Sequence, residues 1–128
     1  MSGNPAGAIQ VCALADLVPE RGAAAFVGGE QVAVFRLLDD TVRVVSQRDP
    51  FSGANVMSRG IVGTRQGEPT VAAPMYKQVF SLNTGRCLER VGYEPKEGAD
   101  PDLRSWPAAV VDGVVWVEPV PAQLGLVT

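Results

Sequence analysis

The chain has 128 residues, a length that typically forms one domain and excludes a large enzyme with several cofactors. Hydrophobic residues make up 46% of it, charged residues 20%, and the net charge is −3 at pH 7, a balance typical of an ordered globular protein. The sequence has neither a basic stripe nor an acidic tail, so we expect no binding to nucleic acid.

Histidine is absent from the chain, which excludes every catalytic triad that depends on an imidazole. Cys12 and Cys87 are the only cysteines, whereas structural zinc and iron–sulfur sites usually need three or four clustered Cys or His ligands. No charged segment followed by an apolar run opens the chain, and no apolar run is long enough to span a membrane. We therefore expect a soluble, cytoplasmic protein without membrane contact.

The excess of valine indicates an all-β protein. Valine occurs 20 times against nine leucines and two isoleucines, and β-branched residues favour strands over helices. Glycine and proline together number 24, so the chain is interrupted often, and no long helical periodicity is present. Many short strands joined by tight turns are the expected result.

The chain begins and ends with predicted core strands. In chain order these are expected at 8–14, 23–27, 30–38, 41–47 and 106–118. Gly28-Gly29 and Asp39-Asp40 reverse the chain within a three-strand meander over 23–47, and along 30–38 apolar residues alternate so that one face can be buried. Asp112-Gly113 lies between two apolar runs and predicts a hairpin, because both residues tolerate positive φ.

Residues 48–90 differ from the flanking segments in that their apolar runs are shorter and separated by turns. This pattern predicts a smaller inserted β subdomain. Two pairings are expected there: 61–64 with 70–73 across the turn 65–69, and 79–82 with 86–88 across Asn83-Thr84-Gly85. Residues 90–105 are rich in Pro, Gly and charge and predict a loop that is mobile or used in contacts.

Two turn-rich segments, 47–55 and 73–86, resemble the two ligand loops of Rieske iron–sulfur domains. The second is similar to a Cys-Pro-x-His loop followed by a hairpin that ends in Phe-x-Leu-x-Thr-Gly, with Ala73 in the Cys position and Tyr76 in the His position. The first places Asp49 and Phe51 at the other two ligand positions. A Rieske cluster needs two thiolates on one iron and two imidazoles on the other, so all four ligands are replaced.

Together, 49–63 and 74–78 resemble the small subunit of the assimilatory NAD(P)H-dependent nitrite reductase, over roughly residues 9–118. The resemblance implies an all-β, Rieske-like β-sandwich or partly closed barrel in which residues 1–128 form a single domain. It also implies a large-subunit partner that holds FAD, a [4Fe–4S] cluster and sirohaem and reduces nitrite to ammonium in nitrate assimilation. This chain would then carry no catalytic, cofactor-binding or metal-binding residue.

The candidates for contact with that partner are Phe51, Met75, Tyr76 and Lys77. Aromatic and Met side chains beside a cation are typical of protein interfaces, although Phe51 and Tyr76 could equally fill the space of a cluster. Cations at Arg48, Arg59, Arg65 and Lys77 on or near the insertion could steer docking to an acidic surface. The alternatives are a Rieske-type ferredoxin that carries electrons for an oxygenase and a stand-alone interaction module.

Overall fold

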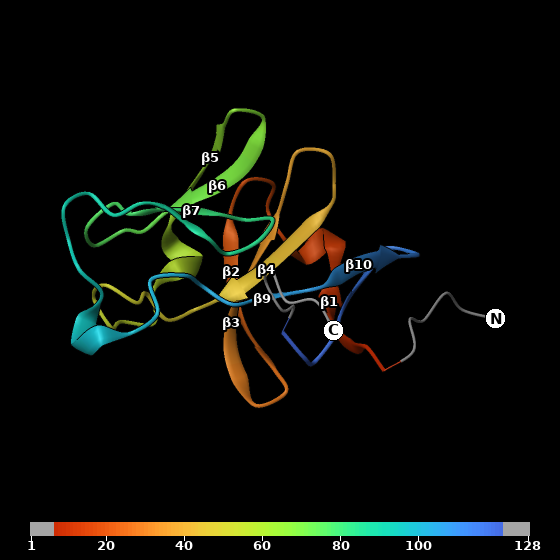
Figure 1. Cartoon of the computed structure of the whole chain (residues 1–128). Coiled ribbons are helices and arrows are strands. Elements are labelled where there is room, and N and C mark those ends of the chain that lie inside the picture. The colour runs from red at the N-terminus through yellow and green to blue at the C-terminus, as the bar shows by residue number, and fades with distance from the viewer. Residues whose placement is uncertain (1–6, 122–128) are drawn as a thin grey trace, which may run out of the picture.

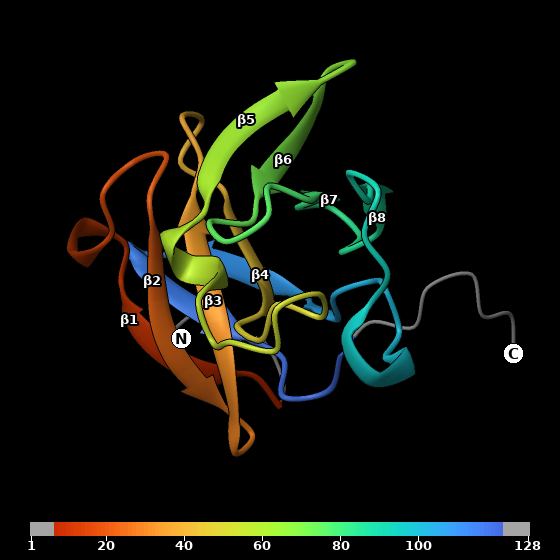
Figure 2. The same cartoon turned by 90° about the vertical axis from the view of Figure 1, so that its left-hand side faces the viewer.

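A computed structural model describes residues 7–121, and within them the chain forms three antiparallel sheets (Figures 1 and 2). The predicted domain bounds of 1–128 also include residues 1–6 and 122–128, which lie outside the described part. The strands are β1 (Ile9–Ala13), β2 (Gly22–Val27), β3 (Glu30–Arg36), β4 (Val42–Ser46), β5 (Ile61–Arg65), β6 (Glu68–Ala72), β7 (Val79–Ser81), β8 (Cys87–Glu89), β9 (Ser105–Trp106), β10 (Ala108–Val111) and β11 (Val114–Val117). Short 3-10 turns are η1 (Leu14–Asp16), η2 (Met57–Arg59) and η3 (Lys96–Gly98).

The central sheet has the order β2-β3-β4-β9 and contains the predicted meander. Strands β2 and β3 join through Gly28 and Gly29, which have φ values of +59° and +84° and form a two-residue turn with Val27 opposite Glu30. A two-residue turn of this kind needs positive φ at both positions, and glycine adopts positive φ without strain. Strand β9, which local pattern did not predict in this sheet, pairs with β4.

A second sheet, β1-β11-β10, joins the two ends of the described chain. Its hairpin turns at Asp112 and Gly113, with φ values of +52° and +76°, which confirms the predicted turn. Strand β1 pairs antiparallel with β11, so the first and last strands lie side by side.

The third sheet, β5-β6-β7-β8, confirms both strand pairings expected within 48–90. The turn between β5 and β6 is shorter than the predicted 65–69, because Arg65 pairs with Glu68 and only Gln66 and Gly67 make the turn, with φ values of +52° and +81°. Pro69 therefore lies within β6, opposite Thr64.

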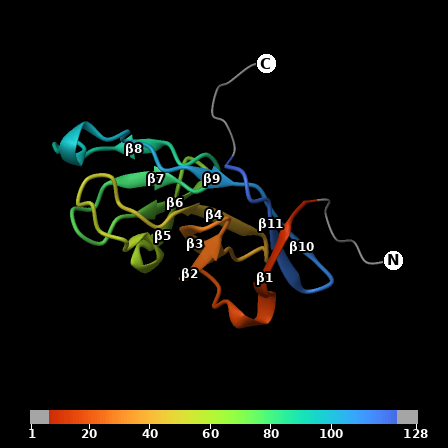
Figure 3. The same cartoon turned by 90° about the horizontal axis from the view of Figure 1, so that it is seen from below.

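Strand β3 of the central sheet is buried on both faces from Val32 to Phe35, whereas one buried face was expected from the sequence. Figure 3 shows it between the other two sheets. Ala33 and Phe35 of β3 pack in a cluster with the third sheet, while Val32 and Val34 pack in a cluster with β11. Successive residues of a strand point to opposite faces, so the stretch of β3 that lies between the two other sheets is apolar at four consecutive positions.

Residues 90–105, predicted as a loop, are anchored at their second half. Leu103 is 2% exposed and its N–H donates to the Gly85 carbonyl over 2.8 Å, while Asp102 accepts the Cys87 N–H over 2.8 Å. The segment is therefore fixed to the turn that follows β7 and to β8. Within residues 7–121, no helix has the length and apolar character needed to cross a membrane.

Candidate functional site

Three loops gather at one end of the molecule (Figures 1 and 2). We call them loop A (residues 47–55), loop B (73–78) and loop C (90–105). Loops A and B are the segments that resemble Rieske ligand loops. Loop C lies beside both of them and bonds to each.

Loop A is organised by Asp49, which is fully buried. One oxygen of the Asp49 carboxylate accepts the Phe51 N–H over 2.9 Å, and the other accepts the Ser52 hydroxyl over 2.9 Å. The Asp49 main chain bonds to Ala54 and Gly53, and a bridge between Arg48 and Asn55 closes the loop. The Asp49 carboxylate thus accepts hydrogen bonds within a tight turn. This is a usual role of Asp.

Phe51 lies in the interior, which corrects its expected role as a partner contact. The side chain is 5% exposed, and its ring centroid lies 6.2 Å from that of Phe80 in a tilted arrangement. Ala73 is fully buried in the same cluster, together with Met57. The aromatic ring fills space between loop A and the third sheet and leaves no surface for docking.

Loop B presents the other three candidates to solvent. The loop is closed by hydrogen bonds from the Ala73 N–H to the Gln78 carbonyl (2.8 Å) and from the Lys77 N–H to the Ala73 carbonyl (3.1 Å). Met75 is 53% exposed, Tyr76 is 36% exposed and Lys77 is also exposed, so this short loop forms the outer tip of the site.

Tyr93 of loop C is a site residue that was not among the candidates expected from the sequence. Its ring stacks on that of Tyr76 with centroids 4.7 Å apart and an interplanar angle of 8°. Tyr93 is 46% exposed, so its ring extends the surface of Met75 and Tyr76, and Val91, two residues earlier in loop C, is 43% exposed. The sequence feature that could have indicated Tyr93 is that it is an aromatic residue within a segment, 90–105, that is otherwise rich in Pro, Gly and charged residues.

The donor set at the four ligand positions does not fit a Rieske cluster. Phe51 and Ala73 carry no donor atom, both Asp49 oxygens are engaged within loop A, and Tyr76 stacks on Tyr93. Within residues 7–121, no three His, Cys, Asp or Glu side chains lie close enough to hold a metal ion. The ferredoxin alternative requires such a cluster, so this donor set argues against it.

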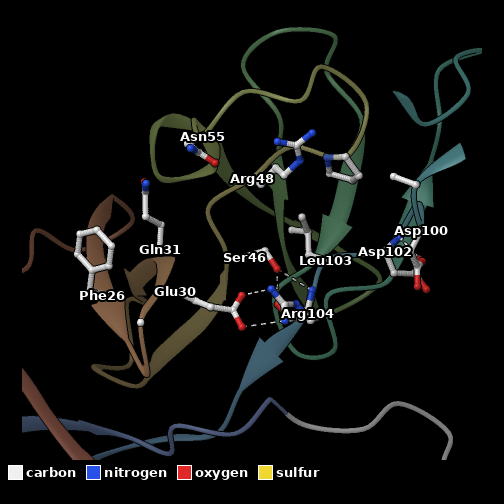
Figure 4. A pocket seen from close by; sticks show the side chains of 13 residues that line it. Phe26, Glu30, Gln31, Ser46, Arg48, Asn55, Asp100, Asp102, Leu103 and Arg104 are labelled. Carbon is white, nitrogen blue, oxygen red and sulfur yellow. Dashed lines mark hydrogen bonds and ion pairs between the residues drawn. The ribbon is translucent and has the colours of Figure 1, made fainter. Parts of the chain in front are cut away.

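A surface pocket of about 490 Å³ lies beside loop A (Figure 4). Glu30 of the β2–β3 hairpin forms an ion pair with Arg104 of loop C at one side of it, and the buried Ser46 hydroxyl accepts the Arg104 N–H over 2.9 Å. The chain has no histidine, so no imidazole base can activate this hydroxyl. The residues that line the pocket can therefore make polar and apolar contacts with a ligand, but they do not include a hydroxyl nucleophile paired with an imidazole base.

The comparisons with known proteins agree with this geometry. The family model "Rieske-like [2Fe-2S] domain" matches residues 8–118. The NADH nitrite reductase small subunit of Salmonella typhimurium is 42% identical over 106 residues, which cover 82% of this chain and 91% of that protein. The solution structure of the nitrite reductase [NAD(P)H] small subunit from Erwinia carotovora has a TM-score of 0.71 at 32% identity, covering 97% of this chain and 90% of that one.

A third relative is much longer than this chain. The nitrite reductase [NAD(P)H] large subunit of Klebsiella oxytoca is 37% identical over 107 residues, which cover 84% of this chain but 10% of that protein. A segment similar to this chain is therefore present within a large-subunit polypeptide.

The fold and the two ligand-like loops define a Rieske-like protein whose donor positions no longer fit a cluster. Within that class, the chain belongs to the family of nitrite reductase small subunits.

Proposed function

We propose that this chain is the small subunit of a cytoplasmic NAD(P)H-dependent nitrite reductase and that it binds and stabilises or orients the large subunit. The observation that carries the proposal is the 42% identity to a nitrite reductase small subunit over 91% of that relative. The family match over residues 8–118 supports one Rieske-like domain for residues 1–128. Membership of this family also argues against a stand-alone module of an unrelated pathway.

The partner is inferred from the Klebsiella oxytoca large subunit, in which a segment similar to this chain belongs to the same polypeptide. A domain that is covalently joined to the catalytic protein in one relative and separate in another is expected to bind that protein non-covalently when separate. We infer that the partner carries FAD, a [4Fe–4S] cluster and sirohaem and converts nitrite to ammonium in nitrate assimilation.

The contribution of this chain is then a surface rather than a reactive group. We define the tip surface as the exposed side chains of Met75, Tyr76, Lys77, Val91 and Tyr93. Exposed aromatic and Met side chains grouped together are the composition that forms interface hot spots. The buried Phe51–Phe80 contact lies beneath loop A and supports the neighbouring loop B through the shared cluster.

Co-expression with the large subunit tests the proposal. The expected result is a complex that survives affinity purification and size-exclusion chromatography, with higher nitrite-reducing activity or thermal stability than the large subunit alone. The same large subunit expressed without this chain is the control. Failure of the two chains to co-purify, together with no gain in activity or stability, would refute the proposal.

A further inference from the structure

Two cationic side chains converge above Gly53 of loop A. A Cβ atom at Gly53 would lie 3.0 Å from Lys96 Cδ and 3.4 Å from Arg48 Nη2, so both side chains cover the face that glycine leaves open. Gly53 has φ of +79°, a backbone conformation that disfavours any side chain at this position. The Lys96 methylene stem and the Arg48 guanidinium therefore both approach a face of loop A that only a residue without a Cβ leaves open.

Neither cation has a carboxylate partner within residues 7–121, whereas Arg65 and Arg90 pair with Glu89 and Glu94. Figure 4 shows the Arg48 side chain directed away from the Glu30–Arg104 pair. The other acids around loop C are occupied by main-chain donors: Asp49 bonds to Phe51, Asp100 to Asp102, and Asp102 to Cys87. Glu94 of this loop is paired with the Arg90 side chain, and Glu97, next to Lys96 in sequence, forms no side-chain hydrogen bond or ion pair within the described residues.

Loop C joins the cation pair to the tip surface. The Lys96 N–H donates to the Pro50 carbonyl over 2.8 Å, which fixes this part of loop C to loop A. Tyr93, three residues earlier, stacks on Tyr76 of loop B. Residues 93–96 of loop C thus connect the tip surface to the cation pair. A partner that covers the tip surface is therefore expected to approach Arg48 and Lys96 as well.

We propose that Arg48 and Lys96 form a carboxylate-binding site that receives an Asp or Glu side chain of the large subunit when the tip surface docks. This inference rests on the proposed function and adds the chemistry of the partner's surface. Two uncompensated cations side by side repel each other, and a carboxylate between them removes that repulsion while accepting charge-assisted hydrogen bonds from the guanidinium and the ammonium. Burial at an interface strengthens such bonds relative to water.

The test compares two double charge reversals in the full chain. Arg48→Glu with Lys96→Glu removes the site, and Arg21→Glu with Arg86→Glu is the matched control, because these two exposed arginines belong to none of loops A, B and C and give the same change in net charge. Affinity for the purified large subunit is measured by calorimetry at about 50 and 300 mM salt, conditions that differ strongly in screening.

The expected result is a loss of about tenfold or more in affinity for the Arg48/Lys96 variant at low salt, with a control variant within about twofold of the wild type. The wild type should lose affinity as salt rises, and the Arg48/Lys96 variant should lose less. Equal losses in both variants would overturn the proposal and indicate a general charge effect. If the wild type itself does not bind, the proposed function fails as well.

Thermal unfolding of each variant accompanies the binding measurement, because a misfolded variant would lose affinity for another reason. If the double reversal unfolds early, the single neutral variants Arg48→Gln and Lys96→Gln replace it. Each should weaken binding severalfold while leaving the unfolding midpoint unchanged, and binding at the wild-type level by both would overturn the proposal.

Discussion

The ring of Tyr76 in loop B stacks on the ring of Tyr93 in loop C, with centroids 4.7 Å apart. These are the only two tyrosines of the chain. Loop B is also bonded to loop C where the Gln78 side-chain amide donates to the Arg90 carbonyl over 3.2 Å, and loop C is bonded to loop A through Lys96 and Pro50. Loop C therefore connects the two ligand-like loops, whose donor set does not fit a bridging cluster.

The tyrosine stack should be measurable as a coupling energy. Tyr76→Ala and Tyr93→Ala are each expected to destabilise the fold slightly, and the double variant by less than their sum. A coupling of about 0.5–1 kcal/mol is expected, because aromatic pairs contribute about 0.5–1.5 kcal/mol and this pair is partly exposed. Urea unfolding of the four proteins provides the measurement, and strictly additive effects would contradict a stabilising stack.

The tip surface should behave as a hot spot for the large subunit. Replacing Met75 and Tyr76 with Ala is expected to weaken binding by about 1–3 kcal/mol, because exposed Met and aromatic side chains lose buried area in the complex. Leu38→Ala is the control, since Leu38 is 75% exposed and belongs to none of loops A, B and C. Titration calorimetry measures both, and unchanged affinity of the double variant would reduce Met75 and Tyr76 to space-filling residues.

Restoring the ligands should not restore a cluster. The variant Asp49→Cys, Phe51→His, Ala73→Cys and Tyr76→His is expected to stay colourless between about 400 and 600 nm after anaerobic treatment with iron and sulfide, the region where iron–sulfur proteins absorb. Phe51→His alone should destabilise the fold by about 2–4 kcal/mol, because an imidazole enters an apolar core. Tyr76→His, at an exposed position, is the control. A stable, iron-containing quadruple variant would contradict this expectation.

Asp49 should matter for folding through its acceptor oxygens. Asp49→Ala leaves the buried Phe51 N–H without its acceptor and is expected to cost about 1–3 kcal/mol in the free energy of unfolding. Asp49→Asn keeps one side-chain oxygen in place, so its cost should be smaller. Equal losses in both variants, measured by denaturant unfolding, would show that charge rather than the acceptor is needed.

Cys87 should react slowly with thiol reagents. Burial raises the pKa of the Cys87 thiol, and the carboxylates of Asp102 and Asp49 raise it as well, against the lowering effects of the Glu89 main chain and Arg90. A raised pKa means less thiolate at a given pH, so alkylation in a Cys12→Ser background should be slower than that of an unfolded control and should accelerate at higher pH. A rate equal to that of the unfolded control at pH 8 would contradict this.

Much of the fold could be predicted because its turns are local. Gly28-Gly29 and Asp112-Gly113 mark hairpins by residue type alone, and both are confirmed. The burial of β3 on both faces was not predictable in the same way, because it depends on a third sheet formed by a distant part of the chain. Strand β9 was missed as part of the central sheet because two residues give no periodicity.

The amino-acid sequence by itself determined the all-β class, the tight turns and the replacement of all four ligands, because residue identity and local backbone preference decide these features. The tertiary structure alone decided that Phe51 is interior, that Tyr93 stacks on Tyr76 and that Arg48 and Lys96 both approach Gly53. Each of these depends on contacts between segments far apart in the chain, and such contacts form only when the sheets pack together.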